Sequence, residues 1–576
     1  MTDTTKTADI TPADSESRTA ALRWVTAFGG LATVASTFMS WTFTDEFPGD
    51  LTVYGYPGGL QVLTLLAGVL IVVHALSALG VKGLGWLAPA GTTRALRLLA
   101  LGALGTTWYT VIAIAAKLGG VVNLEPGGFV AAVASLIPLV AFRLPDDTRK
   151  AKRAKELPSW AEILIIVAVF GTGLYVITYG IDTEYAELFT GYLIIVGFAA
   201  AAIVKSGLLA RISDLTTKYR QVTVVAAFAA AAAFPFTQST DTYTLIAVNI
   251  LIFATVALGL NIVVGLAGLL DLGYVAFLGV GAYTAALVSG STASVFGVQF
   301  PFWAAVLTGA AVSLIFGVVI GAPTLRLRGD YLAIVTLGFG EIFRITVNNL
   351  DGTSGPRLTN GPNGVPNIPD LEFFGYNFGE PHTVLGVELG AYANYYLLML
   401  LAMIVVVLVF SRAGNSRIGR AWVAIREDET AATAMGINGF RVKLIAFALG
   451  ATLAGLAGTV QAHVQHTVVP EMYVFAGPVP PNSAFLLAAV ILGGMGTISG
   501  PLIGATLLYM IPAKLQFLQD YQLLGFGIAL ILLMRFRPEG LIANRRAQLE
   551  FHETDQLDTP DQGRPDSGVS IAKAGA

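Results

Sequence analysis

Ionisable side chains are scarce in the apolar parts of this chain, and three of them could do chemistry there. Asp271, Glu341 and Arg344 lie in or beside long apolar runs. An ionised group at mid-membrane costs about 2.5–3.5 kcal/mol on insertion scales, so such groups are usually paired or functional. Glu341 and Arg344 are three residues apart, a spacing that allows pairing on one helix face. The sequence leaves two roles open for them, a structural ion pair or a place on a path for solutes or protons.

Motifs for hydrolytic or nucleotide chemistry are absent from the sequence. There is no GxxxxGK(S/T) phosphate-binding loop, no GxSxG turn and no HExxH pair. The chain has no cysteine, and its five histidines show no ligand spacing. We therefore expect no catalytic residue, no cofactor, no metal site and no nucleic-acid partner, and any ATP hydrolysis must come from a separate chain.

The longest strongly charged stretch between two apolar runs is 412–443. Within it, Ala421–Met435 is compatible with one short helix, on which Ala431 and Ala432 give a small apolar face. Gly436 then suits the left-handed position that ends a helix. A short helix with small apolar residues and mixed charges fits a cleft of another protein. The alternative from periodicity alone is an ordinary solvated loop.

The elements that would position these residues are membrane helices. Hydrophobic residues make up 55% of the chain and charged residues 12%, about half the charged share of a soluble protein. Apolar runs of near-spanning length predict an all-α, polytopic integral membrane protein with about 16 transmembrane or re-entrant helices. The expected spans are about 22–41, 58–80, 97–117, 126–142, 159–179, 187–205, 221–236, 243–265, 273–290, 301–322, 331–349, 394–411, 443–462, 483–494, 498–516 and 521–535. The run at 483–494 is short enough to be re-entrant.

Loop charges predict the orientation of these helices. Every second loop is basic, while the loops between them hold almost no lysine or arginine, and basic loops face the cytoplasm. The basic loops contain Lys82, Arg94 and Arg97; Arg149, Lys150, Lys152, Arg153 and Lys155; Arg211, Lys218 and Arg220; Arg326 and Arg328; the 412–443 stretch; and Arg537, Arg545 and Arg546. Both termini and 412–443 then lie on the cytoplasmic side.

Residues 419–438, GRAWVAIREDETAATAMGIN, resemble the inner coupling loop of ABC-importer permeases. That loop has the pattern Glu-Ala-Ala, three residues, Gly; here Thr430 stands at the Glu position. The closer resemblance is to the branched-chain amino acid permeases of the LivM type. It is carried also by NIVVGLAGLLDLGYVAFLGVGAY at 261–283, PTLRLRGDYLAIVTLGFGEIFR at 323–344, TNGPNGV at 359–365, GGMGTISGP at 493–501 and RFRPEGL at 535–541.

The resemblance divides the chain into four parts. Residues 206–548 would form the ABC-importer permease core, preceded by an extra six-helix membrane module at 20–205. Residues 1–19 and 549–576 are expected to be a disordered cytoplasmic N-terminus and a disordered cytoplasmic tail. The protein would be a multi-pass protein in the plasma membrane of a prokaryote.

The resemblance also implies function, partners and sites. The chain would be the permease subunit of an ATP-driven importer that moves branched-chain or other apolar amino acids by alternating access. Its partners would be a second permease, two ABC ATPase subunits and an extracytoplasmic substrate-binding protein. Two alternatives stay open, a urea or short-chain amide ABC permease and an ion-coupled secondary transporter acting alone.

Three sets of residues follow from this reading. Coupling to the ATPase is expected at Arg417, Gly419, Arg420, Arg426, Glu429, Ala431, Ala432, Met435 and Gly436. The translocation path or close helix packing is expected at Gly268, Gly273, Gly279, Gly281, Gly338, Gly340, Glu341 and Arg344. Docking of the binding protein is expected at Asn360, Gly361, Asn363 and Gly364, in a turn-rich loop.

Overall fold

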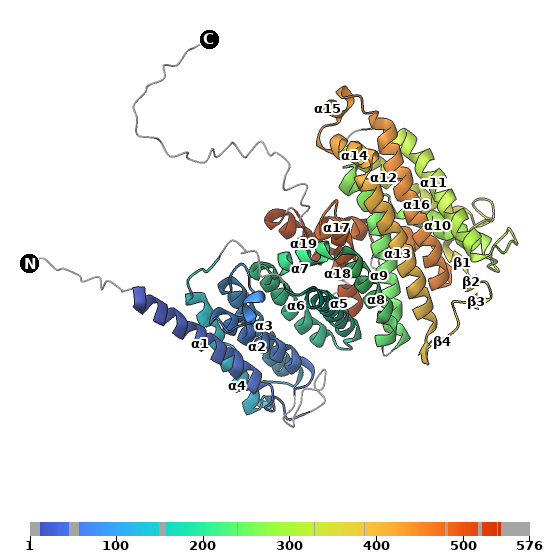
Figure 1. The fold of residues 1–576 in the computed structure, drawn as a ribbon. Helices are drawn as coiled ribbons and strands as arrows, with labels where there is room; N and C mark the ends of the chain where they lie inside the picture. The colour runs from blue at the N-terminus through green and yellow to red at the C-terminus, as the bar shows by residue number, and fades with distance from the viewer. Residues whose placement is uncertain are drawn as a thin grey trace, which may run out of the picture.

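The described residues of the chain fold mainly into helices (Figure 1). The computed structural model describes residues 12–44, 57–148, 157–238, 240–327, 329–384, 386–477, 482–515, 521–537 and 539–542. β-Structure in this part of the chain is limited to two-stranded pieces. Arg149, Lys150, Lys152, Arg153, Lys155, Arg328, Arg545, Arg546, residues 1–11 and the tail at 549–576 lie outside it. The chain is an all-α, polytopic membrane protein.

Eleven helices of the described residues are long and apolar enough to cross a membrane. They are α2 (Gly59–Ala78), α3 (Thr93–Lys117), α4 (Pro126–Ala134) with the 3₁₀ turn Ile137–Arg143, α5 (Ser159–Asp182), α6 (Ala186–Ser206), α8 (Arg220–Ala233) with Phe234–Thr237, α9 (Asp241–Asn261) with the π-helix Ile262–Leu266, α11 (Phe302–Thr324), α12 (Asp330–Asn349), α13 (Ala391–Asn415) and α16 (Gly439–Gln465).

The other expected spans also form helices, but the number of 16 crossings is not confirmed. These helices are α1 (Pro12–Ser36), α10 (Val275–Val288), α17 (Ser483–Gly493), α18 (Ser499–Lys514) and α19 (Gln522–Phe536). With 11 residues, α17 is about 16 Å long at 1.5 Å per residue, too short to cross a bilayer alone. Its length agrees with the expectation of a re-entrant segment.

Helices α1, α2, α3, α4 and α6 form a bundle at one side of the molecule, whereas α5 packs mainly on α8 (Figure 1). In this bundle α1 packs on α2, and α3 packs on α2 and α6. Helix α1 begins at Pro12, inside the segment 1–19 that was expected to be disordered. The amphipathic helix α7 (Leu208–Lys218) then connects α6 to α8.

Helices α9, α10 and α16 form the centre of the larger bundle, and α11 packs against α10 and α16. Close approach is possible because glycines face backbone there. A Cβ on Gly281 of α10 would collide with the backbone of Gly455, and one on Gly458 of α16 would collide with the carbonyl of Leu278. Small residues at such crossings are the usual way that membrane helices pack tightly.

Short strands order the loops at the end opposite α14 and α15. Strand β1 (Val365–Pro366) pairs antiparallel with β6 (Thr467–Val468), which joins the loop after α12 to the end of α16. Two hairpins follow in the same loop, β2 (Glu372–Phe373) with β3 (Tyr376–Asn377), and β4 (His382–Val384) with β5 (Val387–Leu389). Figure 1 shows β1, β2 and β3 near the ends of α10 and α11, and β4 near the end of α13.

Candidate coupling site at one end of the helix bundle

The 412–443 stretch folds into two short helices rather than one. The expected single helix Ala421–Met435 is wrong, because α14 (Arg417–Glu427) ends at Asp428 and α15 (Glu429–Ala434) begins after it. Asp428 is extended, with φ −153° and ψ 106°, and its carboxylate accepts from the backbone N–H groups of Thr430 at 2.7 Å and Ala431 at 2.9 Å. An aspartate that caps the next helix in this way competes with continuation of the first.

The end of α15 confirms the expected left-handed glycine. Gly436 has φ +88°, and its N–H donates to the carbonyl of Thr433 at 3.0 Å, while Ile437 N–H donates to the carbonyl of Ala432 at 3.1 Å. These two bonds form a Schellman motif. The motif turns the chain back toward α16.

Three contacts fix the helix pair to the bundle. The indole Nε1 of Trp422 donates to the carbonyl of Val442 at 2.8 Å, and the Trp422 side chain is fully buried. Arg426 Nη1 donates to the carbonyl of Gly265 in the π-helix at 2.9 Å. Glu429 forms an ion pair with the buried Lys443 at 2.7 Å. The pair is therefore tied both to α16 and to the broken end of α9.

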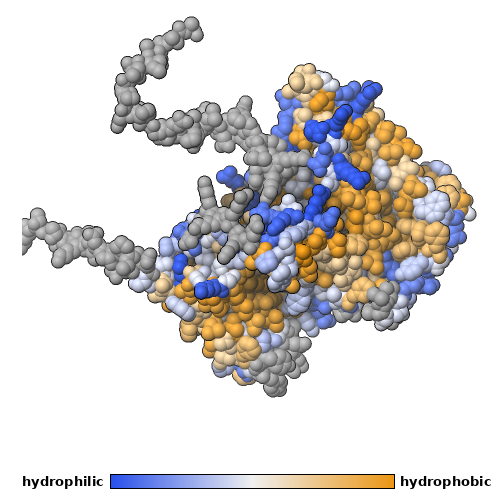
Figure 2. All heavy atoms as spheres, in the orientation of Figure 1, coloured by the Kyte–Doolittle hydropathy of each residue, from blue (hydrophilic) through white to orange (hydrophobic). Residues whose placement is uncertain are grey.

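The predicted coupling residues divide into an exposed and an inward-facing group. Arg417, Arg420, Ala431 and Met435 are exposed, and Met435 shows 84% of its surface. Figure 1 shows α14 and α15 at the end of the larger bundle, and Figure 2 shows hydrophilic side chains gathered at that end. The exposed group forms a surface that could contact another chain.

The inward-facing members of the set hold the site together instead. Gly419 is buried, and a Cβ there would collide with the carbonyls of Ala413 and Gly414 in α13. Ala432 is buried under α15. Arg426 points into the bundle and lines a cavity of about 380 Å³, together with Leu266, Phe410, Gly414 and Thr497.

The glycines of the predicted path set lie at different kinds of places. Gly273, just before α10, packs against Gly340 of α12, and a Cβ on Gly273 would collide with the carbonyl of Thr336. Gly279 packs under Phe343 and Tyr473, whereas Gly338 has open space around it. Gly268, with φ +70°, packs against Arg426 and so belongs to the coupling site rather than to the bundle centre.

Glu341 and Arg344 form the expected ion pair on one face of α12. Arg344 Nε donates to both carboxylate oxygens of Glu341, at 3.0 and 3.1 Å, and Arg344 Nη1 lies 3.3 Å from Glu471. The pair lies at the edge of the bundle, on a face where Ile334, Ile342 and Gly338 are also exposed. Asp271 by contrast is buried, with Oδ1 accepting from Gly273 N–H at 3.0 Å.

The predicted docking residues are mostly internal to their loop. Gly361 packs against Asp351, and Gly364 packs against the carbonyl of Val468, both with φ +62°. Asn360 has φ +61°, and Asn363 is exposed. The cluster shapes the turn that sets up β1.

Sequence reasoning missed several residues that position the site. Asn261 joins the π-helix to the turn before α18, because its Nδ2 donates to the carbonyl of Thr497 at 2.7 Å and its Oδ1 accepts from Gly496 N–H at 2.8 Å. Asp428 could have been found from its helix-capping preference. Trp422 and Lys443 could not, because their partners are fixed only by folding.

The structure defines a multi-pass membrane protein with a pair of short helices at one end of a tightly packed bundle. The family described as branched-chain amino acid transport system permease component matches residues 242–534. The chain belongs to this family. No solved structure matches it.

Curated relatives agree with this assignment. The high-affinity branched-chain amino acid transport system permease protein LivM of Salmonella typhimurium is 39% identical over 350 residues, which cover 59% of this chain and 78% of that protein. LivM of Escherichia coli is 38% identical over 352 residues, with the same coverage. The permease protein LivH of Salmonella typhimurium is 33% identical over 129 residues, 22% of this chain and 40% of LivH.

Proposed function

We propose that this chain is the permease subunit of an ATP-driven importer for branched-chain or other apolar amino acids. The observation that carries the proposal is the helix pair α14–α15. Its outer face exposes Ala431 and Met435, while its inner face is fixed to α16 and the π-helix through Trp422 and Arg426. A force applied to the exposed face is therefore passed to the bundle rather than absorbed by a loose loop.

The ATP would be hydrolysed by two separate ATPase subunits that grip this pair on the cytoplasmic side. Closing of the ATPases moves α14–α15, and the bundle switches between inward-open and outward-open states. ATP can shift this equilibrium only through the different affinities of the complex for nucleotide in the two states. Both termini lie on the same side as α14–α15 in this arrangement.

The second permease would pack against the exposed face of α12. That face carries Glu341 and Arg344 among apolar residues, and a charged pair is costly against lipid. The exposed face of α11, with Trp303, Leu307 and Val319, is apolar and suits lipid. Substrate would then pass between the two permeases, beside α12.

The substrate class is taken from the named relatives, which are branched-chain amino acid permeases. A urea or short-chain amide permease would share the same coupling design. The extra module at 20–205 is a membrane-embedded addition to the permease core at 206–548, and we propose that it stabilises the complex in the membrane.

The test compares uptake with ATP hydrolysis in the reconstituted complex. Ala431→Trp puts a bulky ring on the exposed face, and the double change Arg417→Glu with Arg420→Glu reverses its charge. We expect uptake to fall more than about tenfold, as at an interface hot spot, with the fold unchanged. Lys82→Glu, an exposed charge reversal in the N-terminal module, is the matched control. Unchanged uptake in both α14–α15 variants would refute the coupling assignment.

A further inference from the structure

The hairpin β2–β3 presents an aromatic side chain to solvent. Its turn is formed by Phe374, with φ +50°, and Gly375, with φ +79°. The Phe374 side chain is 94% exposed, and its ring contacts that of Phe373 edge to face at 4.6 Å between centroids. The Phe373 ring in turn meets Phe302 of α11 at 6.3 Å. The hairpin is thus held on α11 while its tip remains uncovered.

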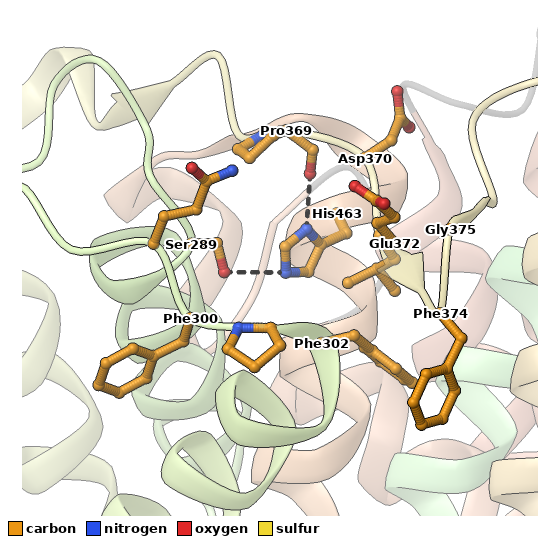
Figure 3. A pocket seen from close by; sticks show the side chains of 12 residues that line it. Ser289, Phe300, Phe302, Pro369, Asp370, Glu372, Phe374, Gly375 and His463 are labelled. Atoms are coloured by element: carbon orange, nitrogen blue, oxygen red, sulfur yellow. Dashed lines mark hydrogen bonds between the residues drawn. The ribbon is translucent and has the colours of Figure 1, made fainter.

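A pocket of about 420 Å³ lies beside this hairpin. Figure 3 shows the rings of Phe300, Phe302 and Phe374 along one side of the view and the carboxyl groups of Asp370 and Glu372 on the other. His463 at the end of α16 completes the lining. Its Nδ1 donates to the carbonyl of Pro369 at 2.8 Å, and its Nε2 lies 3.2 Å from the Ser289 hydroxyl. Both ring nitrogens are therefore already used in holding the loops.

The two carboxylates of the pocket differ in their partners. Asp370 Oδ1 accepts from the Tyr395 hydroxyl at 2.8 Å and lies 3.7 Å from His466 Nε2. Glu372 is exposed, and its carboxylate forms no hydrogen bond or ion pair with any residue that the structure describes. Aromatic faces together with a free carboxylate bind ammonium and guanidinium groups.

The surrounding loop has the same charge sign as the pocket. Residues 350–390 hold five acidic side chains and one arginine: Asp351, Asp370, Glu372, Glu380 and Glu388 against Arg357. Such a surface attracts a positively charged partner and orients it before contact. Aromatic side chains are the usual anchors of a protein interface.

We propose that hairpin β2–β3 and its pocket are the docking site for a basic surface of the extracytoplasmic binding protein. Phe374 enters an apolar recess of that protein, and one of its lysine or arginine side chains enters the pocket beside Glu372. The proposal rests on the importer function proposed above. It places docking at Phe374 and Glu372 rather than at Asn360–Gly364, whose side chains and glycines mainly shape their own loop.

The test is the affinity of the cognate binding protein for the complete importer in nanodiscs, measured at low and high salt. We expect Phe374→Ala and Glu372→Lys each to raise the Kd more than about tenfold, and Phe374→Trp, which keeps an aromatic ring, to restore binding. Glu372→Lys should also weaken the salt dependence. Asn363→Ala, in the alternative loop, should bind as the unaltered importer does.

Two outcomes separate this proposal from the function on which it rests. If the unaltered complex takes up substrate with ATP but Phe374→Ala and Glu372→Lys bind the binding protein normally, the docking proposal alone is overturned. If Asn363→Ala raised the Kd while Phe374→Ala left it unchanged, docking would be assigned to the 360–364 turn instead. Absence of ATP-dependent uptake by the unaltered complex would instead contradict the proposed function. Melting temperature and gel-filtration profile show that each variant is folded.

Discussion

The indole nitrogen of Trp422 in α14 donates to the carbonyl oxygen of Val442 in α16 at 2.8 Å, and the side chain is fully buried. This contact joins the exposed helix pair to α16, a long and largely buried helix of the bundle. Through this contact, a movement of α14–α15 would be transmitted to the bundle.

Removing this contact should loosen the pair from α16. We expect Trp422→Ala to destabilise the region by about 3–5 kcal/mol, as for a buried aromatic side chain. Trp422→Phe keeps most of the packing and loses the hydrogen bond, which costs about 0.5–1.5 kcal/mol. Hydrogen exchange of 417–443 measures the difference. Equal protection in both variants would show that Trp422 does not anchor α14.

Two glycines of the expected path set give a matched comparison. Gly281 faces the backbone of Gly455, so a methyl group there forces α10 and α16 apart, whereas Gly338 has open space. We expect Gly281→Ala to cost about 1–3 kcal/mol, as for an overpacked core, and Gly338→Ala to be neutral or slightly stabilising, since alanine favours helix. Thermal unfolding in detergent checks both. A stable Gly281→Ala variant would contradict the close packing of these helices.

The lack of cysteine in the chain allows a clean test of the α12 surface. Ile342→Cys, at a site that is 62% exposed, should form a cross-link to the second permease when labelled with a benzophenone maleimide. Leu307→Cys on α11, also 62% exposed, should not. Cross-linking at Leu307 without any at Ile342 would show that α11, not α12, meets the partner.

Asp147 caps the start of α3 from a distant loop, and this contact predicts a pH effect. Its carboxylate accepts from the N–H groups of Thr92 and Thr93, both at 2.9 Å. Burial alone would raise the pKa of Asp147, but these hydrogen bonds lower it below its usual value. A lowered folded-state pKa stabilises the protein above the unfolded-state pKa, about 3.9, and this contribution is lost as the pH falls below it.

Replacing Asp147 should therefore reproduce the effect of acid. We expect Asp147→Ala to cost about 0.5–2 kcal/mol at neutral pH, as for loss of a helix cap. The difference from the unaltered protein should shrink as the pH drops below about 4. Asp147→Asn keeps an acceptor oxygen and should lose less stability than Asp147→Ala. Melting temperatures from pH 3 to 7 check this, and a difference that stays constant with pH would rule out the carboxylate as its source.

Hydropathy predicted the helices because every backbone group in lipid must be paired within a helix. Each apolar run forms one, and the pair Glu341–Arg344 follows from a spacing of three residues on α12. The break at Asp428 was missed because a helical apolar pattern continues through it, while a single capping side chain decides the local structure. Periodicity does not report such a competition.

Long-range contacts account for the rest of what the sequence could not predict. Arg426 belongs to the bundle because its partner is the carbonyl of Gly265, far away in the chain. The turn residues Gly361 and Gly364 read as a surface loop, but Gly361 is buried against Asp351 and Gly364 against Val468 of β6. Whether a residue of a helix or loop is buried or exposed depends on neighbours that only folding brings together.

The most direct test of the central claim is leucine accumulation in proteoliposomes, with ATP present or absent inside. The account predicts accumulation only when this chain is assembled with the second permease, the ATPase subunits, the binding protein and ATP. Leucine transport by this chain alone, without ATP, would contradict it and would indicate a secondary transporter.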